Sequence, residues 1–425
     1  MKKTALDACP ALRRSFAPQR IERHLTSYNN SGNEECMTAA TAAVANRRLR
    51  KHKAVMLLGY RGSGYYGMQY NPPHRTIEGE ILAKLLEVGA ISEKNSSAPK
   101  KNSFMAAART DKGVHAMLNL LSLKISLQED TVAKLNAALP PEIRVWGIQP
   151  ANKNFNARSA CGSRWYEYLV PDFALIGPPR SSSLYQIVGE CYREDGSQEV
   201  WDAFLEQARG RFSGDELYRL QDTAQKPCED DPLMQDYVGL LSAALNNYRL
   251  PSSKLHALEA AMKEYVGTHN FYNFTTGKLS GDPSAQRHIK EVVVTQTSSR
   301  WISVRIHGQS FMLHQIRRMV ALAVIVVRCQ LPPSLVRNHF AAGVRKYIPR
   351  APAQGLLLEG PVFDQYNTKL RNLKYREIRP DRITLEHMCR FRDRQIYTAI
   401  AQEETQHHVF CHFVRRMNCL VTPII

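Results

Sequence analysis

The segment ARTDKGVHA, residues 108–116, places a carboxylate where chemistry could occur. Asp111 lies between Arg109 and Lys112, in a loop between two apolar stretches. Cations beside a carboxylate favour its ionised form, and an ionised carboxylate held in position is a nucleophile or a general base. Asp followed two residues later by Gly is also ordinary turn chemistry. The pattern alone leaves both interpretations open, with Asp111 as the candidate nucleophile.

A second segment, FNARSACGSRWYEYLV, combines arginine with aromatic residues. Arg158 precedes a strand-like stretch that holds Trp165, Tyr166 and Tyr168. Single-stranded RNA is recognised by cations that contact phosphate and by rings that stack on bases. The alternative is a half-buried strand with one aromatic face in the core. Alternate strand residues point to opposite faces, so Tyr166 and Tyr168 share a face and Trp165 points away.

Two further segments carry candidate contacts with a ligand. The loop GTHNFYNFT contains His269 and Phe271, and its rings either pack on their own core or stack on bases. The run SFMLHQIRRM places His314 and Arg317 on one face of an apolar helix. A buried arginine must be paired, and Asp111 is the obvious partner for Arg317. The alternative is that Arg317 reaches solvent from the edge of the helix.

Two other patterns resemble cofactor sites only weakly. The glycines of YRGSGYYG, residues 60–67, lack the Gly-Lys-Ser/Thr ending of a nucleotide-binding loop. We interpret them as a turn between strand and helix, with Tyr65 and Tyr66 near RNA. The run HHVFCHF offers His408 and His412 at helical spacing, but no HExxH or paired CxxC supports a metal site. We therefore expect neither a metal nor a cofactor.

The elements around these segments alternate between strand and helix. Residues 54–60 form an apolar run that suits a strand, and helical spacing follows over residues 76–90, with Thr76 as a fair N-cap. Further strands are expected at residues 119–125, 144–150, 165–170, 289–297 and 301–308, and further helices at residues 131–139, 255–266 and 310–327. This alternation predicts an α+β fold.

The chain also divides by composition. At 425 residues it is too long for one small domain. We expect a disordered basic N-terminal segment (1–53), an N-terminal lobe that carries Asp111 (54–153), a C-terminal lobe (154–365) with an insertion at about 176–253, and a charged helical extension (366–425).

The charge of the chain favours a polyanionic partner. The 57 Lys and Arg against 39 Asp and Glu give a net charge of +18. Residues 1–53 carry 11 Lys and Arg against 4 Asp and Glu, or +7, which leaves +11 on the other 372 residues. Phosphate contacts release condensed counterions and so supply affinity. A basic folded body indicates an RNA-binding surface, although a merely solvated basic surface has the same composition.

Three features bear on cellular location. Nine scattered cysteines without a CxxC pair are typical of reduced thiols inside a cell. The longest apolar run, residues 319–327, is far shorter than the ~20 residues that cross a bilayer. The patch RRLRKHK, residues 47–53, suits a nuclear localisation signal or a phosphate-binding flank of the first strand. Acidic residues at 7, 22, 34 and 35 weaken a mitochondrial presequence. We expect the nucleus, with the mitochondrion or cytoplasm as alternatives.

Taken together, seven segments resemble the TruA-like tRNA pseudouridine synthases. They are YRGSGYYGMQ, ARTDKGVHA, LNAALPPEIRV, FNARSACGSRWYEYLV, GTHNFYNFT, GQSFMLHQIRRM and APAQGLLLEG, which occur in the order of that family and span residues 54 to about 366. GTHNFYNFT, the long middle insertion and FRDRQIY near the C-terminus look most like its eukaryotic multisite-specific branch.

The resemblance implies roles for individual residues. The Asp of the family's RTD motif is its nucleophile, which maps to Asp111. The active-site tyrosine of the R-x-Y-x-Y strand maps to Tyr166, and the arginine that pairs with the catalytic Asp maps to Arg317. The expected substrate contacts are Arg109, Arg158, His269 and Phe271.

The resemblance also implies a fold and a reaction. The fold is two α/β lobes whose mainly antiparallel sheets meet edge to edge over a basic cleft. The reaction is the cofactor-free isomerisation of specific uridines in tRNA to pseudouridine, with other structured RNA as a further candidate substrate. No membrane and no obligatory protein partner are expected. The rival readings are a catalytically silent RNA-binding paralogue on the same fold and an adaptor whose basic surface is merely solvated.

Overall fold

The computed structural model describes residues 51–189, 192–221, 231–298, 300–341, 343 and 345–420. Most of the N-terminal segment expected at 1–53, including residues 47–50 of its basic patch, therefore lies outside the described residues. The first strand begins at His52, so the last two residues of that expected segment belong to the sheet. Among the described helices, none has the length and apolar character to cross a membrane.

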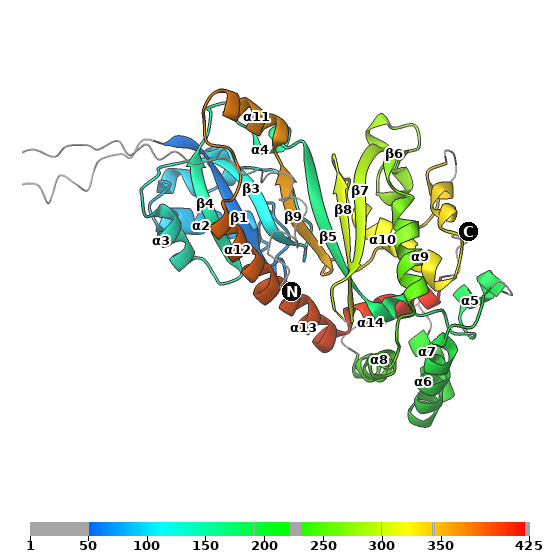
Figure 1. Cartoon of the computed structure of the whole chain (residues 1–425). Helices are drawn as coiled ribbons and strands as arrows, with labels where there is room; N and C mark the ends of the chain where they lie inside the picture. The colour runs from blue at the N-terminus through cyan, green and yellow to red at the C-terminus, as the bar shows by residue number, and fades with distance from the viewer. Residues whose placement is uncertain are drawn as a thin grey trace, which may run out of the picture.

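One mixed sheet of nine strands runs through the described residues (Figure 1). The strands are β1 (His52–Tyr60), β2 (Met105–Ala106), β3 (His115–Ile125), β4 (Ile143–Pro150), β5 (Ser163–Pro171), β6 (Gly267–Asn270), β7 (Gln286–Gln296), β8 (Trp301–Gly308) and β9 (Leu356–Val362). Their order is β4-β1-β3-β9-β5-β8-β7-β6, and β2 pairs with β3 beside this path. The predicted α+β class is confirmed.

The strand β9 joins the two halves of this sheet. It pairs with β3 in parallel, with His115 opposite Leu357, and with β5 in antiparallel fashion, with Tyr166 opposite Leu358. The other neighbouring strands are antiparallel. In Figure 1, β9 lies between β3 and β5 although it comes far later in the chain. Because β9 lies between β3 and β5, the start of β3 and the loop that precedes β3 lie close to Tyr166.

Helices cover both faces of the sheet. They are α2 (Ile77–Glu87), α3 (Thr131–Ala138), α4 (Ala157–Ala160), α5 (Ser183–Val188), α6 (Ser197–Arg211), α7 (Gly214–Gln221), α8 (Pro232–Leu245), α9 (Ser252–Lys263), α10 (Gln315–Arg328), α11 (Asp364–Asn372), α12 (Arg382–Phe391), α13 (Thr398–His407) and α14 (Val409–Asn418). A π-helical stretch, η10 (Arg392–Tyr397), links α12 to α13. The region expected as an insertion holds α5 to α8, and the C-terminal region holds α11 to α14.

Side chains of β1 show how the sheet is covered on both sides. Met56 and Leu58 belong to a core cluster that also contains Ile81 of α2. Leu57, which points the other way, belongs to a second cluster with Met388 of α12. A strand buried on both faces reads as a continuous apolar run, which explains the sequence of residues 54–58.

The helix α10 begins later than its apolar run predicted. Helical spacing starts at residue 310, but α10 starts at Gln315. His314 has φ of 61°, in the left-handed region that a β-carbon disfavours, so the backbone is not helical there. Residues 311–314 instead form a loop before the helix, and this loop lines the site described below.

Candidate active site

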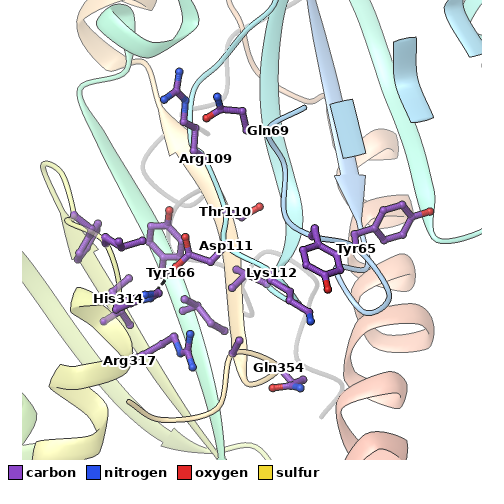
Figure 2. A pocket seen from close by; sticks show the side chains of 18 of the residues that line it. Tyr65, Gln69, Arg109, Thr110, Asp111, Lys112, Tyr166, His314, Arg317 and Gln354 are labelled. Carbon is purple, nitrogen blue, oxygen red and sulfur yellow. Dashed lines mark ion pairs between the residues drawn. The ribbon is translucent and has the colours of Figure 1, made fainter. Parts of the chain in front are cut away.

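A pocket of about 1080 Å³ opens between the loop that carries Asp111 and the start of α10 (Figure 2). Figure 2 shows side chains from both halves of the sheet pointing into this one space. Its lining includes Tyr65, Tyr66, Arg109, Asp111, Lys112, Arg158, Tyr166, Phe311, His314, Arg317, Arg350 and Gln354.

The glycine-rich segment of residues 60–67 holds the Asp111 loop by direct backbone contact. Met68 N donates to Thr110 O at 3.1 Å, and Gly113 N donates to Tyr65 O at 3.3 Å. Gly67 has φ of 93°, and a Cβ there would lie 2.7 Å from Thr110 O. Only glycine permits this backbone conformation at such a close approach. Gly67 therefore positions the candidate nucleophile, a role that the sequence pattern did not reveal.

Thr110 anchors the same loop to the sheet from the other side. Its Oγ1 lies 2.7 Å from the hydroxyl of Tyr60, which also accepts a hydrogen bond from Asn119 Nδ2 at 3.2 Å. Tyr60 and Asn119 are fully buried on β1 and β3. Buried polar groups that satisfy one another hold a single geometry. The residue before Asp111 is thus fixed, while the Asp111 side chain itself is 31% exposed in the pocket.

The Asp111 carboxylate lies close to the ring of a histidine. His314 Nδ1 lies 3.2 Å from Asp111 Oδ2, but Nδ1 has no hydrogen-bond partner among the described residues. The contact is therefore close in distance and misaligned in angle. On the opposite side of the ring, Arg350 Nη1 lies 3.2 Å from Nε2. Burial lowers the pKa of His314, while the charge of Asp111 raises it by a smaller amount.

Tyr166 forms an aromatic wall of the pocket. Its ring meets Phe311 edge to face, with centroids 5.2 Å apart and planes at 82°. The side chain is 8% exposed, and burial raises its pKa. Trp165 points to the other side of the sheet, where it stacks on His307. The predicted alternation of the two faces along this strand is confirmed.

Arg317 reaches the pocket but does not form the expected ion pair with Asp111. Its Nε donates to Ala351 O at 2.6 Å, and no described carboxylate lies within ion-pair distance of it. Burial lowers its pKa from 12.5, with Asp111 among the groups that raise it. The prediction of a direct pair was wrong: the Arg317 guanidinium bonds Ala351 O, and His314 is the residue that lies 3.2 Å from the Asp111 carboxylate. Arg317 instead adds positive charge nearby.

The four expected substrate contacts separate into two groups. Arg109 and Arg158 are exposed and line the pocket. Phe271 is 0% exposed and packs in the aromatic core. His269 Nε2 donates to Val266 O at 3.0 Å, and its ring stacks on Phe340, with centroids 4.3 Å apart. Neither of these two lines the pocket. The complete burial of Phe271 contradicts it as a substrate contact, whereas the contact of the half-buried His269 with RNA stays a prediction. Of the two alternatives for this loop, the structure supports the one in which its rings pack on their own core.

One residue of the pocket was not found from the sequence. Arg350 lies in a loop that is held at several points: Ala351 N donates to Arg317 O at 3.2 Å, and the buried Tyr168 hydroxyl donates to Pro352 O at 2.8 Å. Tyr168 therefore supports the loop and does not face a ligand. The only signal for Arg350 was its place directly before the segment APAQGLLLEG.

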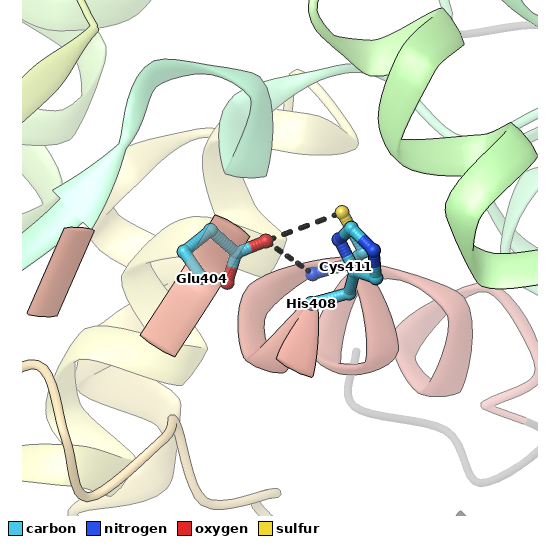
Figure 3. A group of neighbouring side chains, drawn as sticks. All are labelled: Glu404, His408 and Cys411. Carbon is cyan, nitrogen blue, oxygen red and sulfur yellow. Dashed lines mark hydrogen bonds between the residues drawn. The ribbon is translucent and has the colours of Figure 1, made fainter. Parts of the chain in front are cut away.

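The histidine-rich run near the C-terminus forms a helix cap. Glu404, His408 and Cys411 have potential ligand atoms within 4.8 Å of one another (Figure 3). The Glu404 carboxylate accepts hydrogen bonds from Phe410 N at 2.6 Å, from Cys411 N at 3.3 Å and from Cys411 Sγ at 3.2 Å. Burial raises the pKa of the Cys411 thiol, which favours its protonated form. Hydrogen bonds within the protein thus account for the positions of Glu404 and Cys411, whereas His408 Nδ1 is buried without a hydrogen-bond partner among the described residues.

The pocket therefore combines an accessible carboxylate, an aromatic wall and several cationic side chains. A carboxylate can attack an electrophilic carbon, a ring can stack on a planar base, and guanidinium groups bind phosphate. This combination suits a covalent reaction at a nucleotide that belongs to a nucleic acid.

Comparison with known proteins supports the same conclusion. The profile of a family described as tRNA pseudouridine synthase matches residues 261–364. The chain is 82% identical over 370 residues, 87% of its length, to the whole of the tRNA pseudouridine(27/28) synthase of Saccharomyces cerevisiae. It is 41% identical to the tRNA pseudouridine synthase 1 of Eremothecium gossypii over 88% of this chain and 75% of that protein. The corresponding protein of Schizosaccharomyces pombe is 32% identical over 91% of this chain and 86% of its own length.

Proposed function

The chain belongs to the TruA-like tRNA pseudouridine synthases, isomerases that act on tRNA, and from this we propose that Asp111 is its nucleophile. The observation that carries the proposal is the position of Asp111 in the pocket, exposed beside Tyr166 and cationic side chains. We further propose uridines 27 and 28 of tRNA as the targets, because the relative of that name is 82% identical.

The reaction needs no electron, group or energy carrier. The bond between uracil N1 and ribose C1′ breaks, the base rotates, and C5 bonds to C1′. The target base must first leave its stack, which costs a few kcal/mol. Stacking on Tyr166 and phosphate contacts from Arg109 and Arg158 would offset that cost. Asp111 then attacks the nucleoside at C1′ or at uracil C6.

Tyr166 is positioned for a second step. Once C5 has bonded to C1′, the proton on C5 must leave. The raised pKa of Tyr166 means that its hydroxyl is protonated at neutral pH. We propose that the phenol oxygen takes the C5 proton while its own proton passes to the released carboxylate of Asp111. Before that step, Arg317 places positive charge in the pocket and His314 lies beside the carboxylate.

The substrate is bound, in this proposal, in a basic cleft between an N-terminal lobe (54–153) and a C-terminal lobe (154–365). The pocket lining supports it, because five arginines and lysines line it against two acidic residues, Asp111 and Glu403. The five are Arg109, Lys112, Arg158, Arg317 and Arg350. Phosphate contacts of this kind choose RNA by shape and charge more than by base sequence. Structured RNA other than tRNA is a further candidate substrate.

Tritium release tests the catalytic proposal. Transcripts of tRNA that carry [5-³H]uridine lose tritium to water only when C5 exchanges its hydrogen for the ribose bond. The wild type is expected to release tritium and Asp111→Asn to release none. If both proteins release it equally, Asp111 is not the nucleophile. If neither does while tRNA binding is tight, the alternative of a catalytically silent RNA-binding paralogue gains support.

We also propose a nuclear location, on the basis of RRLRKHK at residues 47–53. The test is the location of the full chain fused to a fluorescent protein, with Arg47, Arg48 and Arg50 intact or replaced by alanine. Nuclear signal that depends on these arginines is the expected result. Mitochondrial signal in both proteins would overturn the proposal.

A further inference from the structure

A second hollow adjoins the catalytic pocket. Its volume is about 810 Å³, and it shares five lining residues with that pocket: Arg317, Arg350, Ala353, Gln354 and Glu403. The two spaces therefore adjoin, with Arg317 and Arg350 at the boundary. A strand of RNA whose target base occupies the catalytic pocket must continue on either side of that base. The hollow is one of the places that the RNA next to the target base could occupy.

The hollow is built largely by the expected insertion and the C-terminal region, from which the catalytic pocket takes only Glu403 among its lining residues. Gln235 and Val238 come from α8, in the expected insertion. His408, His412 and Arg416 come from the C-terminal end of the chain and follow one another at intervals of four residues. This spacing puts them on one face of α14, apart from His408, which caps it. Figure 1 shows α8 and α14 close together below the sheet.

The lining suits an anion, and its only aromatic rings are the imidazoles of His407, His408 and His412. Three arginines line the hollow: Arg317, Arg350 and Arg416. Glu403 is the one carboxylate among its lining residues, and it accepts a hydrogen bond from Ser63. The lining contains no Phe, Tyr or Trp, whereas Tyr65, Tyr66, Tyr166 and Phe311 line the catalytic pocket. The aromatic pocket thus fits a base, and the hollow fits the sugar-phosphate backbone.

We propose that the hollow binds the phosphate groups of the nucleotides next to the target uridine, with Arg416 as a principal contact. The inference rests on the proposed function, because it places the neighbours of the base that enters the catalytic pocket. Arg350 links the two sites, since it lines both and contacts His314. The insertion and the C-terminal helices then bind RNA beside the site of reaction.

The test compares Arg416→Gln with a matched control at several salt concentrations. Arg209 is an exposed arginine near the end of α6 that lines neither space, so Arg209→Gln removes the same charge elsewhere. Steady-state tritium release from tRNA gives KM and kcat for each protein. For Arg416→Gln we expect KM to rise about five- to tenfold at moderate salt with kcat unchanged. The slope of log KM against log salt should fall by about 0.7 to 0.9, the value for one phosphate contact.

Further variants keep the outcome decisive. Arg416→Lys retains the charge and should keep most of the wild-type KM, whereas Arg416→Glu should raise KM beyond Arg416→Gln. Thermal unfolding shows whether any variant has lost its fold. If Arg416→Gln and Arg209→Gln have the same KM and salt slope, the hollow does not bind RNA. If the wild type itself releases no tritium from any tRNA, the proposed function has failed rather than this inference alone.

Discussion

His314 Nδ1 lies 3.2 Å from Asp111 Oδ2, off the line of a hydrogen bond. The other ring nitrogen faces Arg350 at 3.2 Å, and a guanidinium group can only donate. Nε2 must therefore accept, which leaves the proton of the neutral imidazole on Nδ1, beside the carboxylate. Catalytic hydrogen bonds are often misaligned before substrate binds and tighten in the complex. We infer that His314 orients Asp111 once a uridine is in place.

Replacement of His314 should therefore reduce turnover more than binding. A hydrogen bond to a charged group contributes about 1.5–3 kcal/mol, so His314→Ala should lower kcat about 10- to 100-fold. His314→Gln can still present a donor and should recover part of this loss. Tritium release at saturating and limiting tRNA separates kcat from KM. A wild-type kcat in His314→Ala would contradict the orienting role.

The same histidine predicts a feature of the pH profile. Because burial lowers the pKa of His314, the imidazole stays neutral at neutral pH. As the pH falls through that lowered pKa, Nε2 gains a proton and the hydrogen bond from Arg350 is lost. The acid limb of kcat should thus lie below the ordinary histidine range near pH ~6.5. His314→Gln should lack this limb, and an unchanged acid limb in that variant would assign it to another group.

Two substitutions separate the contribution of the Tyr166 ring from that of its hydroxyl. Tyr166→Phe keeps the ring against Phe311 and should bind tRNA as the wild type does. It removes the proposed acceptor of the C5 proton, so tritium release should slow about 100-fold or more, the scale of general base catalysis. Tyr166→Leu removes the aromatic ring as well and should also weaken binding. Normal release by Tyr166→Phe would restrict Tyr166 to stacking.

The glycine-rich loop offers a matched pair of substitutions. Gly64 and Gly67 both have positive φ, but only at Gly67 would a Cβ meet a neighbour, at 2.7 Å from Thr110 O. Backbone strain alone costs about 1–3 kcal/mol at either position. Gly67→Ala should lose additional stability and, because it displaces the Asp111 loop, more kcat than Gly64→Ala. Urea unfolding and tritium release at saturating tRNA measure the two effects. Equal losses would mean that the loop contact does not position Asp111.

Local patterns in the sequence predicted the elements and much of the pocket. Period-two and helical spacing located strands and helices because each depends on neighbouring residues alone. Thr76 caps α2 through a hydrogen bond from Gly79 N, as its type and place suggested. Asp111 and Tyr166 lie in one pocket, although the turn at Asp111 is also real, since Val114 N donates to Asp111 O at 3.1 Å. The turn and the catalytic readings of that segment are thus compatible.

Long-range relationships could not be read in the same way. The pairing of β9 with both β3 and β5 joins residues at least 188 positions apart, as in the pair Tyr168 and Leu356, and no local period reports it. A positive φ at His314 is unexpected from residue type, so neither the late start of α10 nor the approach of His314 to Asp111 was foreseen. The burial of Phe271 depends on what packs over its loop, because an aromatic residue serves a core and a ligand equally well.

Glu404, which caps α14 beneath the proposed phosphate site, predicts how stability varies with pH. Burial raises its pKa from 4.5 to about 7 in the folded protein, so the folded state holds a proton that the unfolded state releases above pH ~4.5. The stability that this carboxyl contributes is complete below that pH and is lost as the pH rises to about 7. The full change is on the order of 3 kcal/mol.

Glu404→Gln has no proton to lose there, so its free energy of unfolding should depend less on pH. Urea unfolding of the wild type and of Glu404→Gln at pH 5 and pH 8 measures this pH dependence. Burial also raises the pKa of Glu359 to about 7. Because both proteins contain Glu359, its contribution cancels when the free energy of unfolding of one protein is subtracted from that of the other at the same pH. Relative to the wild type, Glu404→Gln should be less stable at pH 5, where it lacks one acceptor for the backbone N–H groups of α14, and should regain that loss at pH 8. A constant difference across this range would show that Glu404 is already ionised in the folded protein, and that the cap binds α14 as a charged group.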